Sequence, residues 1–148
     1  MDFDAFVGRG SLVSETVGSV EDGDGREYAE AAREAALEIG RVVMADAVPG
    51  VDVWAYEGDA MESVVALRND APGSPAVGCY EGLSLWVEPE MRGRGLGERL
   101  VVEAAKARGG SPVAGEEAVA FSEAGWEVHG RAYETCREEN VFEAPPEP

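Results

Sequence analysis

Apolar positions along the first third of the chain recur with a helical period. Through residues 26–47 they return at three- and four-residue steps, which predicts an amphipathic helix with Asp24 as its N-cap. The face comprises Tyr28, Ala31, Ala35, Ile39, Val42 and Val43. We expect Pro49 and Gly50 to end this helix. Residues 1–25 are less regular and predict either a short helix or a strand, followed by the turn-rich segment 21–25.

The middle of the chain changes to alternating positions and short apolar runs, which predict strands. These strands are residues 51–56, 63–67, 76–80 and 83–87, and residues 69–75 form a loop. A helix follows from Leu96 and stops at Gly109 and Gly110. Its buried face comprises Leu96, Leu100, Val101 and Ala104.

The last part of the chain predicts one more helix. Residues 111–114 are a short extended piece, and residues 116–140 carry Trp126, His129, Tyr133 and Cys136 at helical steps. The proline-rich residues 142–148 are expected to be a disordered tail. The elements together predict a single mixed α/β domain over residues 1–141, with a sheet of three to five strands and helices on both faces.

Composition limits the class of protein. The chain has 148 residues, of which 45% are apolar, enough for a real core. No stretch is long and apolar enough to span a membrane, and the acidic N-terminus is unlike a secretory signal, so we expect a cytoplasmic protein. Cys79, Cys136 and the lone His129 are too few for a disulfide framework or a zinc site, and we expect both cysteines to be buried.

Charge is the second strong feature, because 30 Asp and Glu against 12 Lys and Arg give a net charge of −18 at pH 7. Such a field repels nucleic acid and anionic membranes, which leaves a cationic partner or substrate, or a cytoplasm of very high salt. The acids are spread along the whole chain and Lys106 is its only lysine, a composition that resembles that of halophilic archaeal proteins. The sequence leaves open whether the chain acts alone or as a homodimer.

The segment from residue 83 to residue 97 combines a strand, a glycine-rich turn and a helix N-terminus. Unpaired N–H groups, the positive end of the helix dipole and close backbone approach at glycine make such a turn an anion site. Arg92 and Arg94 add planar cationic donors that suit phosphate, although a solvated surface turn would have the same composition. The spacing of Gly93, Gly95 and Gly97 fits neither a dinucleotide-binding fingerprint nor a P-loop.

The pattern Arg92-x-x-Gly95-x-Gly97, led in by Val87-Glu-Pro-Glu, resembles the acetyl-CoA signature of the GNAT family of N-acetyltransferases over residues 76–110. The resemblance implies acetyl-CoA as cofactor and a central sheet whose signature strand splays from its neighbour, so that the cofactor enters the wedge. It assigns the pantetheine arm and the thioester oxygen to main-chain N–H groups of Leu85, Trp86 and Val87. It assigns the pyrophosphate to the turn formed by Arg92, Gly93, Arg94, Gly95, Leu96 and Gly97.

The resemblance also supplies candidate catalytic residues. Glu81 stands eleven residues before Arg92, at the start of the signature strand, where the histone-acetylating branch places its base. Apolar neighbours would partly desolvate Glu81, although an exposed turn carboxylate is the alternative. Tyr133 is the candidate acid that protonates the thiolate, and its alternative role is core packing. His129 is the third candidate, and its alternative role is a structural hydrogen bond.

The C-terminal half departs from the family pattern. Residues 121–126 only faintly echo the segment that usually follows the signature helix, so we expect a rebuilt acceptor half. The function expected is acetyl-CoA-dependent transfer to an amine of a small molecule or protein. The alternative is a non-catalytic module that binds CoA, and an acidic decoy for a basic partner ranks last.

Overall fold

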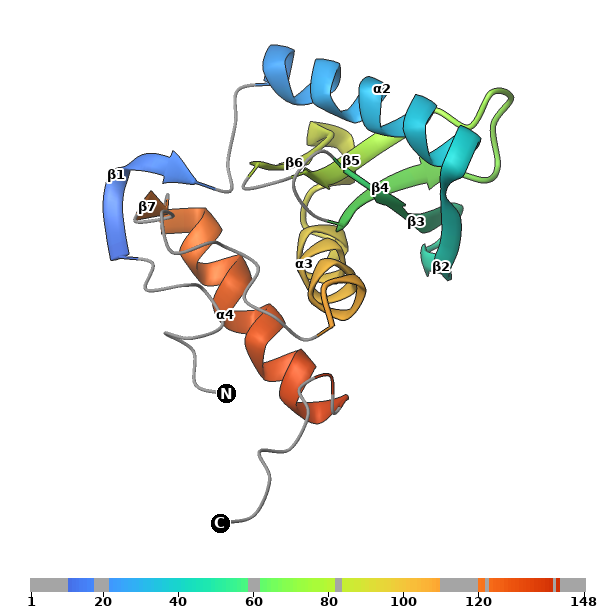
Figure 1. Ribbon diagram of the computed structural model, residues 1–148. Coiled ribbons are helices and arrows are strands. Elements are labelled where there is room, and N and C mark those ends of the chain that lie inside the picture. The colour runs from blue at the N-terminus through green and yellow to red at the C-terminus, as the bar shows by residue number, and fades with distance from the viewer. Residues whose placement is uncertain are drawn as a thin grey trace.

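The computed structural model describes residues 11–17, 22–58, 62–81, 84–109, 120–121, 123–139 and 141. They form a five-stranded sheet, a separate two-stranded sheet and three α-helices, which confirms the mixed α/β class (Figure 1). The large sheet comprises β2 (Arg41–Val48), β3 (Val51–Glu57), β4 (Glu62–Arg68), β5 (Ala76–Glu81) and β6 (Ser84–Val87), in that spatial order. All four pairings in it are antiparallel. Among the described strands, β6 is paired with β5 along its whole length, and none is splayed from it.

The first helix, α2 (Asp22–Ile39), is shorter at its end than predicted, because residues 41–48 form strand β2. Gly40 makes the corner: a Cβ there would lie 2.7 Å from the carbonyl oxygens of both Ala36 and Ala55, so only glycine fits. The β-branched Val42 and Val43 then favour a strand. Pro49 and Gly50, predicted to stop the helix, instead form the turn between β2 and β3.

The predicted buried face of α2 was also wrong. Ala29, Ala32 and Ala36 are the buried positions, whereas Tyr28 and Ile39 are 43% and 61% exposed. Small side chains let the helix approach the sheet closely. Close packing therefore favours the alanine stripe as the buried face over the stripe that carries larger apolar residues. Asp24 is not an N-cap, since it lies inside the helix.

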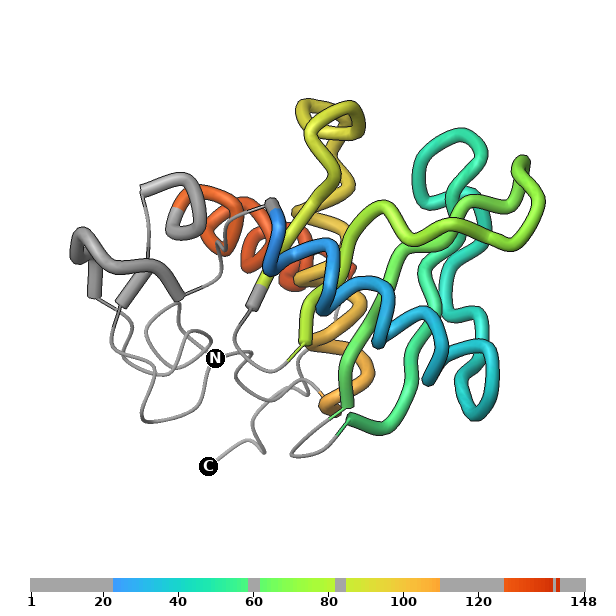
Figure 2. The backbone as a smooth tube through the Cα atoms, turned by 90° about the horizontal axis from the view of Figure 1, so that it is seen from above, coloured from blue at the N-terminus to red at the C-terminus, as the bar shows by residue number. Residues whose placement is uncertain are grey.

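The two faces of the sheet carry separate cores. Helix α2 covers one face, where its alanines pack with a cluster that includes Tyr56, Cys79 and Trp86. Helix α3 (Leu96–Ala107) covers the other with the four apolar residues predicted for its face, all buried. Figure 1 shows α2 and α3 on opposite sides of the strands, and Figure 2 shows α2 crossing them diagonally from the β6 side to the β2 side.

Helix α4 (Glu123–Glu138) packs against α3 and begins later than the predicted residue 116, because Ala120–Phe121 form the short strand β7. Strand β1 (Ser11–Val17) pairs with β7 in parallel, which decides the open question for that part of residues 1–25 in favour of a strand. The predicted extended piece at 111–114 and the predicted tail at 142–148 lie outside the described residues. Cys79 and Cys136 are buried thiols, as expected. No helix in the described part of the chain is long and apolar enough to cross a membrane.

Candidate functional site

Strand β6 occupies one edge of the five-stranded sheet, and its pairing with β5 determines which backbone groups face outward. The N–H of Glu88 donates to the carbonyl of Val77 at 2.8 Å, and the register continues with Gly78 opposite Val87. Hydrogen-bonded and non-hydrogen-bonded pairs alternate along an antiparallel ladder. The N–H groups of Leu85 and Val87 therefore turn toward the outer edge, whereas that of Trp86 faces β5.

The side chain of Trp86 belongs to the α2 face of the sheet. It is 3% exposed, and a Cβ on Gly25 of α2 would clash with its ring. The Arg26 guanidinium lies 5.8 Å from the centroid of the indole and forms an ion pair with Glu88 at 2.7 Å. The indole therefore packs the start of α2 against β6. This packing in the core explains why the Trp86 side chain lies on the α2 face of the sheet.

The turn after β6 has the backbone conformation that an anion site needs. A short 3-10 helix, Pro89–Met91, leads into Gly93 and Gly95, whose φ angles are +79° and +82°. Neither glycine has an atom within 4 Å of the position a Cβ would take, so the backbone there is open to approach. Gly95 is the N-cap of α3 and offers no side-chain cap, which leaves the first N–H groups of the helix for a ligand.

The remaining residues of the turn divide into exposed cations and packed positions. Arg92 and Arg94 are both exposed, and the Nε of Arg92 donates to the Val87 carbonyl at 2.9 Å, which holds it beside the end of β6. Leu96 is buried, so only its main chain faces the turn. A Cβ on Gly97 would lie 3.7 Å from Val87, ordinary van der Waals contact.

The sequence predicts that Glu81 begins the signature strand, and this is wrong. Glu81 is the last residue of β5, where it lies directly opposite Ser84 of β6. It is half-buried, and the alternation of the strand puts it on the same face as Cys79. Burial, and next to it the nearby Glu81 carboxylate, raise the pKa of the Cys79 thiol to about 12. Glu81 thus lies on β5 beside the start of β6, one strand inward from the edge strand of the described sheet.

The other two candidates lie one turn apart on α4. His129 is fully buried, and its Nε2 lies 2.7 Å from the hydroxyl of Tyr80, whose register partner is Leu85. Tyr133 is 8% exposed, and the Arg137 guanidinium lies 5.8 Å from its ring centroid. The structure therefore brings His129 to the strand beside β6, whereas Tyr133 belongs to the core between the α3 face and α4.

Sequence reasoning missed two residues that surround this region, Tyr80 and Arg108. The Arg108 guanidinium lies 5.3 Å from the Tyr80 ring centroid, and its Nε donates to the Glu62 carbonyl at 2.7 Å. Burial lowers the pKa of Arg108. The sequence gives one indication of Tyr80, which immediately precedes the candidate base Glu81. It gives no indication that residues 80 and 129 lie in contact.

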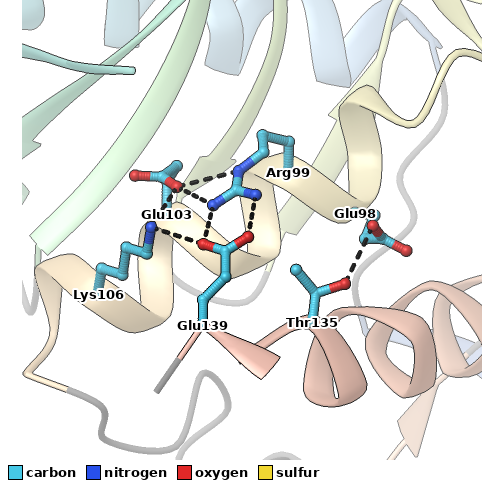
Figure 3. Close-up of polar contacts among 6 residues, drawn as sticks. All are labelled: Glu98, Arg99, Glu103, Lys106, Thr135 and Glu139. Atoms are coloured by element: carbon cyan, nitrogen blue, oxygen red, sulfur yellow. Dashed lines mark hydrogen bonds and ion pairs between the residues drawn. The ribbon is translucent and has the colours of Figure 1, made fainter. Parts of the chain in front are cut away.

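Four charged side chains join the signature helix to α4 (Figure 3). Arg99 donates from Nε to Glu103 at 3.0 Å and from Nη1 to Glu139 at 2.8 Å, and Lys106 lies 2.9 Å from Glu139. Glu103 is only 3% exposed, so its charge needs both cations. Hydrogen bonds from Arg99 and Lys106 lower the pKa of Glu139 to about 2. This network fixes α4, with its two candidate residues, against the helix that follows the glycine turn.

The described residues contain no group of three His, Cys, Asp or Glu side chains that could hold a metal ion. Comparison with protein families matches residues 20–125 to the family described as Acetyltransferase (GNAT) family. That range runs from the start of α2 to the start of α4 and includes β6, the glycine turn and α3. Comparison with curated proteins and with solved structures found no match.

Proposed function

Because the chain belongs to the GNAT family of acetyltransferases, we propose that it transfers the acetyl group of acetyl-CoA to an amine of a small molecule or a protein. The observation that carries this proposal is the continuity of three features. Strand β6 has outward N–H groups at Leu85 and Val87. The turn after it contains two glycines with positive φ, and the N-terminus of α3, which has no side-chain cap, follows the turn.

Acetyl-CoA supplies the thioester, and the chain supplies the groups that hold it. The diphosphate would bind at Gly93 to Gly97, where the helix dipole is positive, with Arg92 and Arg94 as exposed cations beside it. The pantetheine arm would pair with the outer edge of β6. Outward N–H donors at Leu85 and Val87 could then polarise the thioester carbonyl.

In the proposed reaction the amine nitrogen attacks the thioester carbon, the new N–C bond forms, and the C–S bond breaks to release the CoA thiolate. Glu81 accepts the proton that the ammonium must lose, and Tyr133 gives a proton to the thiolate. The half-buried position of Glu81 beside the start of β6 supports the first role. Tyr133 lies on the helix that the charged network holds against α3, which supports the second.

One observation favours a second candidate function, a CoA-binding module without catalysis. His129 and Tyr133 are both buried in packing against the sheet and α3, and such positions are consistent with purely structural roles. Under this alternative the glycine turn still binds the cofactor, so the two functions differ only in turnover.

The test is release of free CoA thiol from acetyl-CoA, followed over a panel of primary amines in molar KCl. Transfer is expected to give thiol release that depends on the amine and an acetylated product visible by mass spectrometry. Tight CoA binding without amine-dependent release for any amine would support the module and contradict the transferase.

A further inference from the structure

The proposed cofactor must contact two parts of the structure at once. Its pantetheine arm would pair with the outer edge of β6, and its diphosphate would bind at the glycine turn. A ligand that reaches two sites binds tightly only when the sites are held at the spacing that the ligand requires. The residue that joins β6 to the turn therefore decides how well one molecule of CoA fits both.

That residue is Glu88, which follows the last residue of β6 and precedes the short 3-10 helix. Its N–H donates to the carbonyl of Val77 at 2.8 Å, which closes the ladder with β5. Its carbonyl accepts from the N–H of Met91 at 2.8 Å, which begins the 3-10 helix. Pro89 restricts the backbone before it to an extended conformation, in agreement with the φ of −52° and ψ of 133° at Glu88.

The carboxylate of Glu88 is held by a third element, helix α2. Arg26 donates from Nη2 to one carboxylate oxygen at 2.7 Å and from Nε to the other at 3.4 Å. A two-point contact of this kind fixes orientation as well as distance. The two residues are 62 positions apart in the sequence, so this contact exists only in the folded chain.

The first turn of α2 is itself packed on β6. A Cβ on Gly25 would clash with the Trp86 ring, so the helix backbone lies directly against the indole. The Arg26 guanidinium lies 5.8 Å from the centroid of the same ring, within the range of a cation–π contact. Trp86 and Glu88 share a face of the strand, because they are two residues apart. Arg26 therefore contacts β6 at Trp86 and the connection beyond it at Glu88.

We propose that Arg26 is a positioning residue for the cofactor, which acts through Glu88 to hold the glycine turn at a fixed orientation to the outer edge of β6. This rests on the proposed function, in which β6 and the turn bind acetyl-CoA. Arg26 acts without touching the cofactor, because it restrains the residue that joins the two halves of the site. A cofactor that spans both halves then binds without first ordering this connection, and its thioester lies beside the donors of β6.

This role separates ligands that span the site from ligands that fill one half of it. ADP would occupy the turn alone, pantetheine would occupy the edge of β6 alone, and CoA would occupy both. Loss of the restraint should therefore weaken the binding of CoA and leave the binding of each fragment unchanged. A general loss of structure would weaken all three ligands.

The experiment measures binding by the full chain at one fixed KCl concentration, with calorimetry for CoA and ligand-observed NMR for ADP and pantetheine. Arg26→Gln is expected to weaken CoA binding about fivefold, the effect of a partly exposed ion pair, with both fragments unaffected. Glu88→Gln should give the same loss, and the double variant should be no weaker than either single variant. A long-range effect of charge on the diphosphate would instead act in opposite directions in the two single variants.

The matched control is Arg41→Gln. Arg41 forms an ion pair with Glu62 and its side chain is 59% exposed, close to the 54% of Arg26. It lies on β2, at the opposite edge of the five-stranded sheet from β6, so this variant should bind CoA as the wild type does.

Three results would overturn the proposal. These are an unchanged CoA affinity in Arg26→Gln, an equal loss of affinity for CoA and ADP, or losses in the single variants that multiply in the double variant. If the wild type binds no CoA, the proposed cofactor site fails, and the role of Arg26 fails with it. That outcome is recognised from the wild type alone, before any variant is compared.

Discussion

The hydroxyl of Tyr80 and Nε2 of His129 lie 2.7 Å apart in the interior and connect β5 to α4. Their rings meet edge to face, with centroids 5.5 Å apart. Burial raises the pKa of Tyr80, while the nearby Arg108 opposes that rise, so the phenol is protonated and can donate to the imidazole. One hydrogen bond therefore links the strand beside the signature strand to the helix that carries the candidate acid.

Loss of this hydrogen bond should reduce stability. Tyr80→Phe leaves a buried imidazole nitrogen without its phenol partner, at a cost of about 1–3 kcal/mol in the free energy of unfolding. Denaturant titration measures it, and Tyr28→Phe at an exposed site should show no change. Equal stability of Tyr80→Phe and the wild type would mean that the contact contributes nothing.

The network between α3 and α4 predicts a dependence on pH. The pKa of Glu139 is lowered to about 2 by Arg99 and Lys106, from the ordinary glutamate value of 4.5. A lowered carboxyl pKa stabilises the fold above the unfolded-state value, and this contribution is lost as pH falls from about 4.5 toward 2. Glu139→Gln should therefore lower the melting temperature at pH 7, by the equivalent of about 1 kcal/mol or less, and the difference should shrink at acid pH.

The control for that experiment is Glu134→Gln, at an exposed position of α4. A Glu139→Gln variant whose deficit stays constant between pH 7 and pH 2.5 would show that the carboxylate charge is not what joins the helices.

The charge of −18 predicts that salt stabilises the fold. Thermal stability should rise with KCl well beyond the range where ordinary screening saturates, since the Debye length is already about 3 Å at 1 M. Melting curves from low salt to several molar KCl provide the measurement. A flat or falling melting temperature would favour a cationic partner as the reason for the excess of acids.

Periodicity was enough to predict four strands of the large sheet and α3, because their buried positions alternate or recur regularly. It failed at residues 41–48, where a helical spacing of valines continued past Gly40. The tight corner there depends on the carbonyl of Ala55, which only the folded chain brings close. The sequence around Gly40 alone therefore could not predict this contact.

The glycine turn was also predictable, because its chemistry is local to the six consecutive residues from Arg92 to Gly97. The surroundings of Glu81 were not. Strand order brings Ser63 of β4 beside it, and Tyr80 meets His129 across 49 positions of sequence. Such neighbours follow from strand order and helix packing, which a single sequence does not encode in any short pattern.

Turnover should separate the two catalytic candidates. Glu81→Gln keeps the shape of the side chain but cannot accept a proton, so the rate should fall by about 10²–10⁴-fold while acetyl-CoA binding persists. The deficit should shrink as pH rises, because more of the amine arrives deprotonated. Tyr133→Phe should slow thiolate departure with no such dependence on the protonation of the amine. Wild-type rates for Glu81→Gln at every pH would reduce Glu81 to a turn carboxylate.

Cofactor binding by the glycine turn is the central claim, and calorimetry of CoA with Gly95→Glu tests it most directly. Gly95 has a φ of +82° and an open approach, so a glutamate adds both bulk and negative charge where the diphosphate would bind. Gly109→Glu is the matched control, because Gly109 also has a positive φ and open surroundings but lies just beyond the opposite end of α3. At fixed salt we expect no measurable CoA binding by folded Gly95→Glu and wild-type affinity in Gly109→Glu. Unchanged affinity in a folded Gly95→Glu variant would contradict the account.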